Sequence, residues 1–238
     1  MKYTEKYKVR WHDTDATRKV RPSELLVYMQ ETANRQFESA GRDLDDERDT
    51  QRVAFILSRI SLDFYAPIRA YEEIEVDTFT CESRGFSFER GFLIRKNGET
   101  VAKGASVWAL VDLENGNLIR AESYDVGFEN EPKVVTDTPL RIRMPKPEEF
   151  THVGKRKISY SDIDYNMHMN NTKYPNMLCD FMDISDTEKI TGMSLSYLHE
   201  AALGDEIDIY RVKTDDGYFF KTINNDGKVL LEALVLCK

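Results

Sequence analysis

Two copies of one sequence pattern occur in this chain, and this internal repeat limits the fold more than any other feature. The segments Trp11–Lys19 (WHDTDATRK) and Tyr160–His168 (YSDIDYNMH) both place an aromatic residue two positions before an Asp-x-Asp motif. Each segment follows an extended basic stretch and precedes apolar residues at helical spacing. A chain of 238 residues can form one large domain or two small ones. The repeat favours one small unit that occurs twice.

Each copy continues with a pattern typical of one amphipathic helix. The first stripe consists of Leu26, Met29, Ala33, Phe37 and Ala40. The second consists of Tyr174, Met177, Leu178, Phe181 and Met182. Pro22 and Pro175 suit the first helical turn, where no amide hydrogen is needed, and Gly41 suits the end of the first helix. We therefore predict one long helix in each unit.

About four strand-like segments follow each predicted helix. The clearest pairs are Ile60–Tyr65 with Met193–Leu198, and Glu72–Val76 with Asp205–Ile209. Asn97-Gly98 and Asp226-Gly227 are favoured hairpin turns, because these residues tolerate positive φ. A single helix must bury its apolar face against its own sheet. We predict an α+β fold, a tandem (double) hotdog in which each unit is a long helix wrapped by a curved antiparallel sheet. A duplicated ferredoxin-like or cystatin-like unit is the alternative.

A proline-rich segment separates the two copies. Four of the seven prolines lie in residues 127–150, namely Pro132, Pro139, Pro145 and Pro147. Proline lacks the amide hydrogen that central strands and helix interiors need, so the segment is interpreted as a connector. We predict an N-terminal unit over residues 1–126, the connector over residues 127–150, and a C-terminal unit over residues 151–238.

Composition excludes several classes of function. The 42 acidic and 33 basic residues give a net charge of −9, which argues against nonspecific nucleic-acid binding. The longest apolar run, Ala233–Cys237, is far shorter than the roughly 18–20 residues that span a bilayer. The first residues lack the apolar core of a signal peptide. Three cysteines without C-x-x-C spacing argue against a disulfide framework. We expect a cytoplasmic protein that binds neither nucleic acid nor membrane.

The two copies differ at three positions with chemical potential. The second copy has Asn166, His168 and Glu200 where the first has Thr17, Lys19 and Pro67. Imidazole exchanges protons near neutral pH, a carboxamide can bind an oxyanion, and a carboxylate made more basic by burial can take a proton from water. Asp164 is close enough in sequence to orient Asn166 or His168. Such a group around one water suits thioester hydrolysis, because a thiolate leaves readily.

Each of these residues also has a structural interpretation. A single histidine near a helix start often caps or packs, and glutamate is common on surfaces. Asp162 and Asp164 fit turn and capping positions. A metal site would need more ligands than a single histidine with carboxylates supplies. We therefore expect neither a metal nor another cofactor.

The segment Asp162–Tyr174 (DIDYNMHMNNTKY) resembles the D-x-D-x-N-x-H-x-N-N-x-x-Y signature of acyl-acyl carrier protein (acyl-ACP) thioesterases, a plant and bacterial double-hotdog family. The similarity extends over nearly the whole chain. It implies a catalytic site of Asp164, Asn166 and His168, joined by Glu200 as the later glutamate. It also implies hydrolysis of acyl-ACP to a free fatty acid in fatty acid biosynthesis. The partner would be acyl carrier protein bearing an acylated phosphopantetheine.

One position departs from the plant members of that family. Ala201 stands where they have a cysteine, so a covalent cysteine mechanism cannot run there and activation of water is favoured. The division of the base role between His168 and Glu200 stays open, and so does a homodimer. An acyl-CoA thioesterase, a hotdog acyl-thioester dehydratase and a non-catalytic acyl-binding protein are the alternatives.

The resemblance further implies that the first unit holds the acyl chain, with Leu26, Met29 and Phe37 as candidates for lining a tunnel. An acidic carrier would need a local basic surface on this acidic chain. Such a patch is predicted at Lys155–Lys157 and at Arg18, Lys19 and Arg21.

Overall fold

One antiparallel sheet of eleven strands runs through the computed structural model, which describes residues 1–238. The first half contributes β1 (Tyr3–Lys8), β2 (Val53–Phe64), β3 (Glu73–Thr80), β4 (Phe88–Lys96), β5 (Glu99–Asp112) and β6 (Leu118–Ile119). The second contributes β7 (Thr151–Lys157), β8 (Ile190–Tyr197), β9 (Glu206–Thr214), β10 (Gly217–Asn224) and β11 (Val229–Cys237). The strand order is β1-β3-β4-β5-β2-β8-β11-β10-β9-β7, with β6 paired to β5. The order outward from β2 therefore repeats outward from β8.

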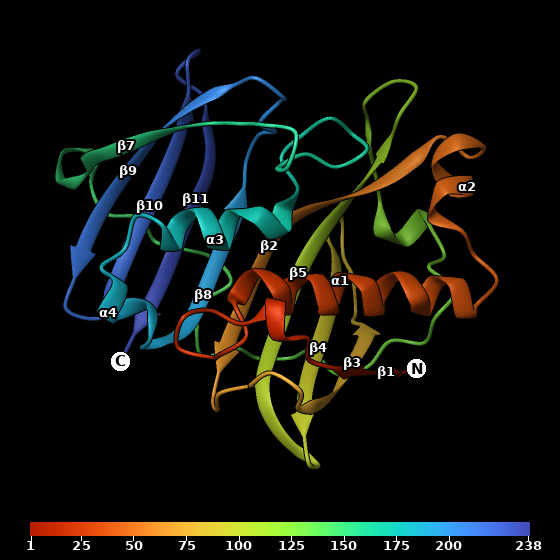
Figure 1. Cartoon of the computed structure of the whole chain (residues 1–238). Helices are drawn as coiled ribbons and strands as arrows, with labels where there is room; N and C mark the ends of the chain where they lie inside the picture. The colour runs from red at the N-terminus through yellow and green to blue at the C-terminus, as the bar shows by residue number, and fades with distance from the viewer.

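The helices lie across one face of this sheet (Figure 1). They are α1 (Pro22–Ser39), α2 (Leu44–Asp49), α3 (Tyr174–Cys179) and α4 (Ile184–Thr187). Short 3₁₀ turns cover Trp11–Asp13, Ala121–Ser123, Pro147–Glu149 and Asn171–Lys173. A helix packed on a curved sheet, repeated once, is the tandem hotdog predicted from the sequence. None of the helices has the length and hydrophobicity needed to cross a membrane.

The first predicted helix is confirmed, and its ends follow from local chemistry. Pro22 occupies the first turn of α1, and Gly41 has a positive φ of 72° just beyond the last turn. The predicted stripe is buried as far as Phe37, whereas Ala40 lies past the end of the helix and is exposed.

The prediction of a long second helix is wrong. Helix α3 has only six residues and ends at Cys179. The Asp180 amide still bonds four residues back, to Asn176, but those of Phe181 and Met182 bond only three residues back, to Leu178 and Cys179. This tighter turn ends the helix, although Met182 still reaches the core. An apolar stripe in the sequence indicates which side chains are buried, but it does not indicate whether a helix or a tight turn buries them.

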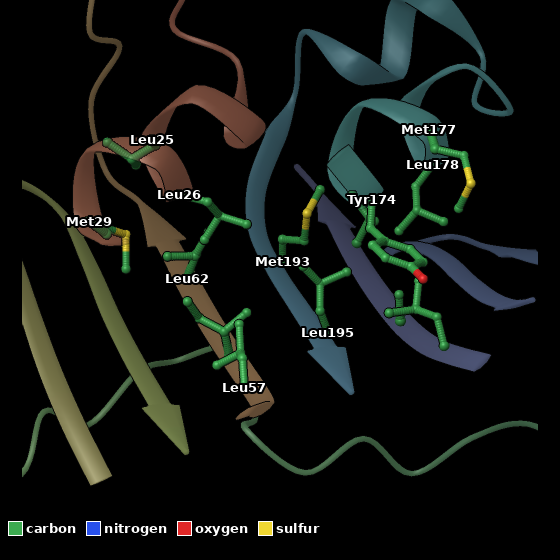
Figure 2. Close-up of a cluster of buried hydrophobic side chains, with 14 of the residues drawn as sticks. Leu25, Leu26, Met29, Leu57, Leu62, Tyr174, Met177, Leu178, Met193 and Leu195 are labelled. Carbon is green, nitrogen blue, oxygen red and sulfur yellow. The ribbon is translucent and has the colours of Figure 1, made fainter. Parts of the chain in front are cut away.

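A continuous hydrophobic core crosses the boundary between the halves. It contains 33 buried residues and includes side chains of helices α1 and α3 and of the central strands β2 and β8. Figure 2 shows Leu26 of α1 beside Leu62 of β2, and Met193 and Leu195 of β8 next to them. Strands β2 and β8 pair over five residues, from Arg59 to Asp63. The halves therefore share both a sheet and a core.

The connector is attached to the sheet where β2 meets β8. Residues 127–150 contain no α-helix or strand. The buried carboxylate of Asp63 accepts hydrogen bonds from the backbone amides of Asp137 and Thr138, at 2.7 and 2.9 Å. Gly192 of β8 lets Thr138 approach closely, because a Cβ at this position would lie 1.9 Å from the Thr138 hydroxyl oxygen. The division into two units and a connector at the predicted boundaries stays a prediction.

Candidate active site

Asp162 holds the loop that carries the candidate residues. Its carboxylate is buried and accepts hydrogen bonds from the Ser159 amide, at 3.0 Å, and from the Arg156 guanidinium. Its carbonyl oxygen accepts the Asn170 amide at 2.8 Å. Asp162 is therefore a structural residue that ties β7 to the start of the second helical segment.

Asp164 folds the next turn of the same loop. Its carboxylate accepts the backbone amide of Asn166 at 2.9 Å, which is an Asx turn. Its own amide donates to the His168 carbonyl oxygen at 3.0 Å, and Met167 between them has a positive φ of 65°. The Asp164 carboxylate makes no hydrogen bond to the side chain of Asn166 or His168. The structure thus shows Asp164 shaping the loop that presents those two side chains.

His168 and Glu200 come together from distant parts of the sequence. A backbone bridge joins His168 to Ala202, so the loop lies against the chain that follows β8. The His168 Nδ1 atom lies 3.1 Å from Glu200 Oε2. The side chains of His168 and Glu200 are 35% and 59% exposed. Glu200 is therefore not the buried carboxylate that the sequence led us to consider as a base. A neutral imidazole that donates from Nδ1 keeps an accepting lone pair on Nε2.

The Asn166 carboxamide is free to bind a ligand. Asn166 is half-buried, and its side chain makes no hydrogen bond within the protein. Its backbone amide is fixed by Asp164, so the position of the side chain is restricted while its donors stay available. An amide of this kind can donate to a carbonyl oxygen that gains negative charge.

Two tyrosines pack together near the loop that carries the candidate residues. Tyr174 and Tyr197 meet edge to face, with ring centroids 5.4 Å apart. The Tyr197 hydroxyl donates to the Asn171 carbonyl oxygen at 2.9 Å. Burial, together with the negative charges of Glu200 and Asp205, raises the pKa of Tyr174 above its usual value. Both phenols therefore stay protonated and neutral near pH 7.

The first half also reaches the candidate site, through a residue that the sequence did not indicate. The Arg48 guanidinium of α2 lies 5.0 Å from the ring centroid of Tyr165, in the loop between Asp164 and Asn166. A cation over an aromatic face is attractive. Arg48 lies among acidic residues in a six-residue helix, and nothing in that local pattern indicates a contact with the second half.

None of the three cysteines is prepared to act as a nucleophile. Burial raises the pKa of Cys179 to about 12 and that of Cys237 to about 11, and it also raises the pKa of Cys81. Ala201, directly after Glu200, is completely buried. The structure thus agrees with the sequence in offering no thiolate at the site.

The backbone of the candidate site is repeated in the first half. The residues Arg18 and Met167 both have a φ of 65°. The backbone bridge between Lys19 and Arg69 matches the one between His168 and Ala202. The alignment of the two copies that the sequence indicated is therefore confirmed, and the halves differ here in side chains.

Neighbouring acids compensate most of the basic patch predicted before the site. Lys155 lies 2.9 Å from Glu206 and 3.5 Å from Asp208. Arg156 pairs with Asp162 and Asp180. The segment therefore offers less free positive charge than its sequence indicates, and docking of a carrier through it stays a prediction. No group of three or more His, Cys, Asp or Glu side chains is placed to hold a metal ion.

Fold and site together define a class, a tandem hotdog protein whose second unit presents an imidazole–carboxylate pair and, in the same loop as the imidazole, a free carboxamide. Residues 1–124 match the family model of the acyl-ACP thioesterase N-terminal domain, and residues 146–233 match that of the C-terminal domain. The chain belongs to the acyl-ACP thioesterase family.

Individual relatives are distant in sequence but close in fold. The chain is 23% identical over 216 residues to the chloroplastic palmitoyl-acyl carrier protein thioesterase of Arabidopsis thaliana, covering 83% of this chain and 52% of that protein. It thus spans about half the length of the curated relatives that it matches. A solved acyl-ACP thioesterase of Bacteroides thetaiotaomicron superposes with a TM-score of 0.90 at 19% identity, over 100% of this chain and 98% of that one. The 12:0-ACP thioesterase of Umbellularia californica gives 0.87 at 17% identity, over 100% and 97%.

Proposed function

We propose that this protein hydrolyses the thioester of acyl-ACP and releases a free fatty acid and the carrier thiol, as a cytoplasmic step of fatty acid biosynthesis. The observation that carries this proposal is the contact of His168 Nδ1 with Glu200, which leaves Nε2 free in the same loop as the unpaired Asn166 carboxamide. Membership of the acyl-ACP thioesterase family supports the substrate class.

In the proposed reaction His168 Nε2 takes a proton from a water molecule as its oxygen attacks the thioester carbonyl carbon. The carbonyl electron pair moves to oxygen, and the Asn166 carboxamide donates a hydrogen bond to it. When the carbonyl re-forms, the carbon–sulfur bond breaks and its electron pair leaves with sulfur. The thiolate then takes the proton held by the imidazolium. One water is consumed, and one carboxylic acid and one thiol are formed.

Geometry supports His168 as the base and Glu200 as the group that orients it. The Glu200 carboxylate lies 3.1 Å from Nδ1, where it favours a proton on that nitrogen, leaves the Nε2 lone pair free and stabilises the imidazolium that forms. As residue types, an imidazole is the stronger base near neutral pH, and a solvated carboxylate is a weak one. Asp164 acts as a positioning residue through the Asn166 backbone.

The proposed partner is acyl carrier protein bearing an acylated phosphopantetheine, without nucleic acid or membrane. The first unit would hold the acyl chain. Leu26 and Met29 are completely buried in the core and Phe37 nearly so, which makes an acyl tunnel at these positions a prediction that requires them to move. A homodimer also stays a prediction, which sedimentation of the purified protein would test.

Product analysis tests the proposed function. Acyl-ACP and acyl-CoA of matched chain lengths are incubated with the enzyme, and free thiol and free fatty acid are quantified. We expect equal amounts of both products, and a higher kcat/KM for the carrier substrate. An acyl-CoA thioesterase would show the reverse preference. An enoyl thioester without free thiol would identify a dehydratase, and tight binding without product would identify an acyl-binding protein.

A further inference from the structure

A cavity of about 240 Å³ lies between the halves and is lined by residues of both. One wall is the loop from Asp15 to Val20 with the start of α1, and a second is the segment Phe64–Ile68 after β2. The opposite wall is Thr187–Thr191, between α4 and β8. Figure 1 shows the loop between β1 and α1 beside α4 and the start of β8.

This cavity occupies the first-half counterpart of the candidate active site. Its lining residues Asp15, Lys19 and Pro67 stand where the second half has Asp164, His168 and Glu200. The two loops have the same positive-φ position and the same backbone bridges. The first half therefore has the same backbone conformation that presents the candidate base in the second half, but it carries different side chains at these positions.

The substitutions leave a cation where the second half has a base. The Lys19 ammonium is half-buried, donates to the Glu188 carbonyl oxygen at 2.6 Å and makes no ion pair. The nearby Asp15 carboxylate oxygen is engaged by the amide and hydroxyl of Thr17, at 2.8 and 2.7 Å. Because Pro67 has no ionisable side chain, nothing replaces the carboxylate that faces His168. The loop thus offers the positive charge of Lys19, while an oxygen of its one carboxylate, Asp15, is held by Thr17.

Apolar side chains line part of the same cavity, which also contains the charged residues Glu188, Lys189 and Lys238. The apolar side chains of the cavity come from both halves and include Val20, Leu25, Phe64, Ile68 and Ile190. Its volume is below the roughly 300 Å³ at which pockets for whole drug-sized ligands begin. The cavity therefore fits an anionic head group and the first carbons of an attached alkyl chain.

We propose that this cavity is a second, non-hydrolytic site, which binds an alkyl carboxylate such as a free fatty acid. Lys19 pairs with the carboxylate, and the apolar wall covers the adjoining methylenes. Because a free carboxylate has no leaving group for hydrolysis, the ligand binds there without reaction. The site does not depend on the proposed hydrolysis, since a fatty acid from any source presents the same head group.

Carbon-13 NMR of carboxyl-labelled dodecanoate, at concentrations below micelle formation, tests the proposal with the full chain. The site gives a bound carboxyl resonance that disappears in Lys19→Gln, whose affinity we expect to fall by about tenfold or more through loss of a charge-assisted pair. Pro67→Glu serves as an independent variant at an exposed position, because it supplies Lys19 with a competing carboxylate. Lys8→Gln, an exposed lysine without an ion pair at the end of β1, is the matched control and keeps the resonance.

A second bound resonance that remains in all three variants reports binding at another place, for example at the proposed acyl site, and is counted separately. The proposal is overturned when no bound resonance depends on Lys19, or when Pro67→Glu leaves the Lys19-dependent resonance unchanged. It is also overturned when inorganic phosphate at equal concentration displaces that resonance, because the site would then recognise charge without the alkyl chain. Thiol release from acyl-ACP is measured in parallel, so failure of the proposed function is seen independently.

Discussion

Replacing Asp63 by alanine tests how the connector is held against the sheet. The Asp63 carboxylate is 2% exposed and accepts two backbone amides of the connector, those of Asp137 and Thr138. Thr138 is 1% exposed, so its amide has no access to water when the carboxylate is removed. Asp137 is exposed, so its amide can turn to solvent.

The magnitude follows from this difference between the two amides. A hydrogen bond to a charged group contributes about 1.5–3 kcal/mol, and we assign that range to Thr138. The solvent-accessible amide of Asp137 contributes about 0.5–1 kcal/mol. Asp63→Ala should therefore lower the free energy of unfolding by about 2–4 kcal/mol, a large part of the roughly 5–15 kcal/mol typical of native proteins. At about 2–4 °C per kcal/mol for a chain of this size, Tm falls by about 4–16 °C.

Urea unfolding followed by tryptophan fluorescence, together with calorimetry, measures both quantities. Asp137→Ala is the matched control, because its carboxylate is exposed and accepts a single long hydrogen bond, from the Tyr65 hydroxyl at 3.3 Å. We expect the control to stay within about 0.5 kcal/mol of wild type. If the unfolding free energies of Asp63→Ala and Asp137→Ala agree within error, the connector is not held by this carboxylate and the reasoning is wrong.

Two further predictions concern the core and the acid response. Leu26→Ala, at a fully buried position of α1, should lower the free energy of unfolding measured in urea by about 2–5 kcal/mol. Val27→Ala, on the exposed side of the helix, should change it little. Equal effects of the two substitutions would contradict the assigned helix face. Hydrogen bonds from Tyr218 and Lys213 lower the pKa of Asp186 to about 2. The stabilisation that this carboxylate provides is therefore complete above its pKa in the unfolded chain, near 3.9, and is lost as the pH falls toward 2. The difference in unfolding free energy between wild type and Asp186→Asn should therefore close between pH 5 and pH 2, and a difference that stays constant over that range would refute the assignment.

The repeat in the sequence predicted those parts of the structure that depend on local chemistry. Asp13 and Asp162 are both buried and both accept the amide three residues earlier, as the paired Asp-x-Asp motifs indicated. Helix α1 begins at Pro22 and stops before Gly41, because a proline start and a positive-φ glycine are local signals. These features need no knowledge of the partner element, so a single sequence carries them.

Features that depend on contacts between distant segments were less accessible. The length of α3 is set by a tight turn at Phe181, and no residue type in the apolar stripe signals it. The contact of Arg48 with Tyr165 joins the two halves and has no periodic signature. The sequence indicated His168 and Glu200 by asymmetry between the copies, yet it did not indicate that Glu200 stays exposed while its carboxylate contacts the imidazole. The exposure of a side chain depends on how the whole sheet packs, so a local sequence pattern does not predict it.

The central claim is that the His168–Glu200 pair of the second unit activates water for thioester hydrolysis. The most direct test is the kcat of thiol release from acyl-ACP for His168→Ala beside His152→Ala. His152 is a matched control, because it lies in the same half and also contacts a carboxylate, with its Nε2 atom 2.7 Å from Asp208. We expect His168→Ala to lose roughly a hundredfold or more in kcat, as removal of a general base requires, and His152→Ala to keep the wild-type value. Equal kcat in both variants, with both proteins folded, would contradict the account.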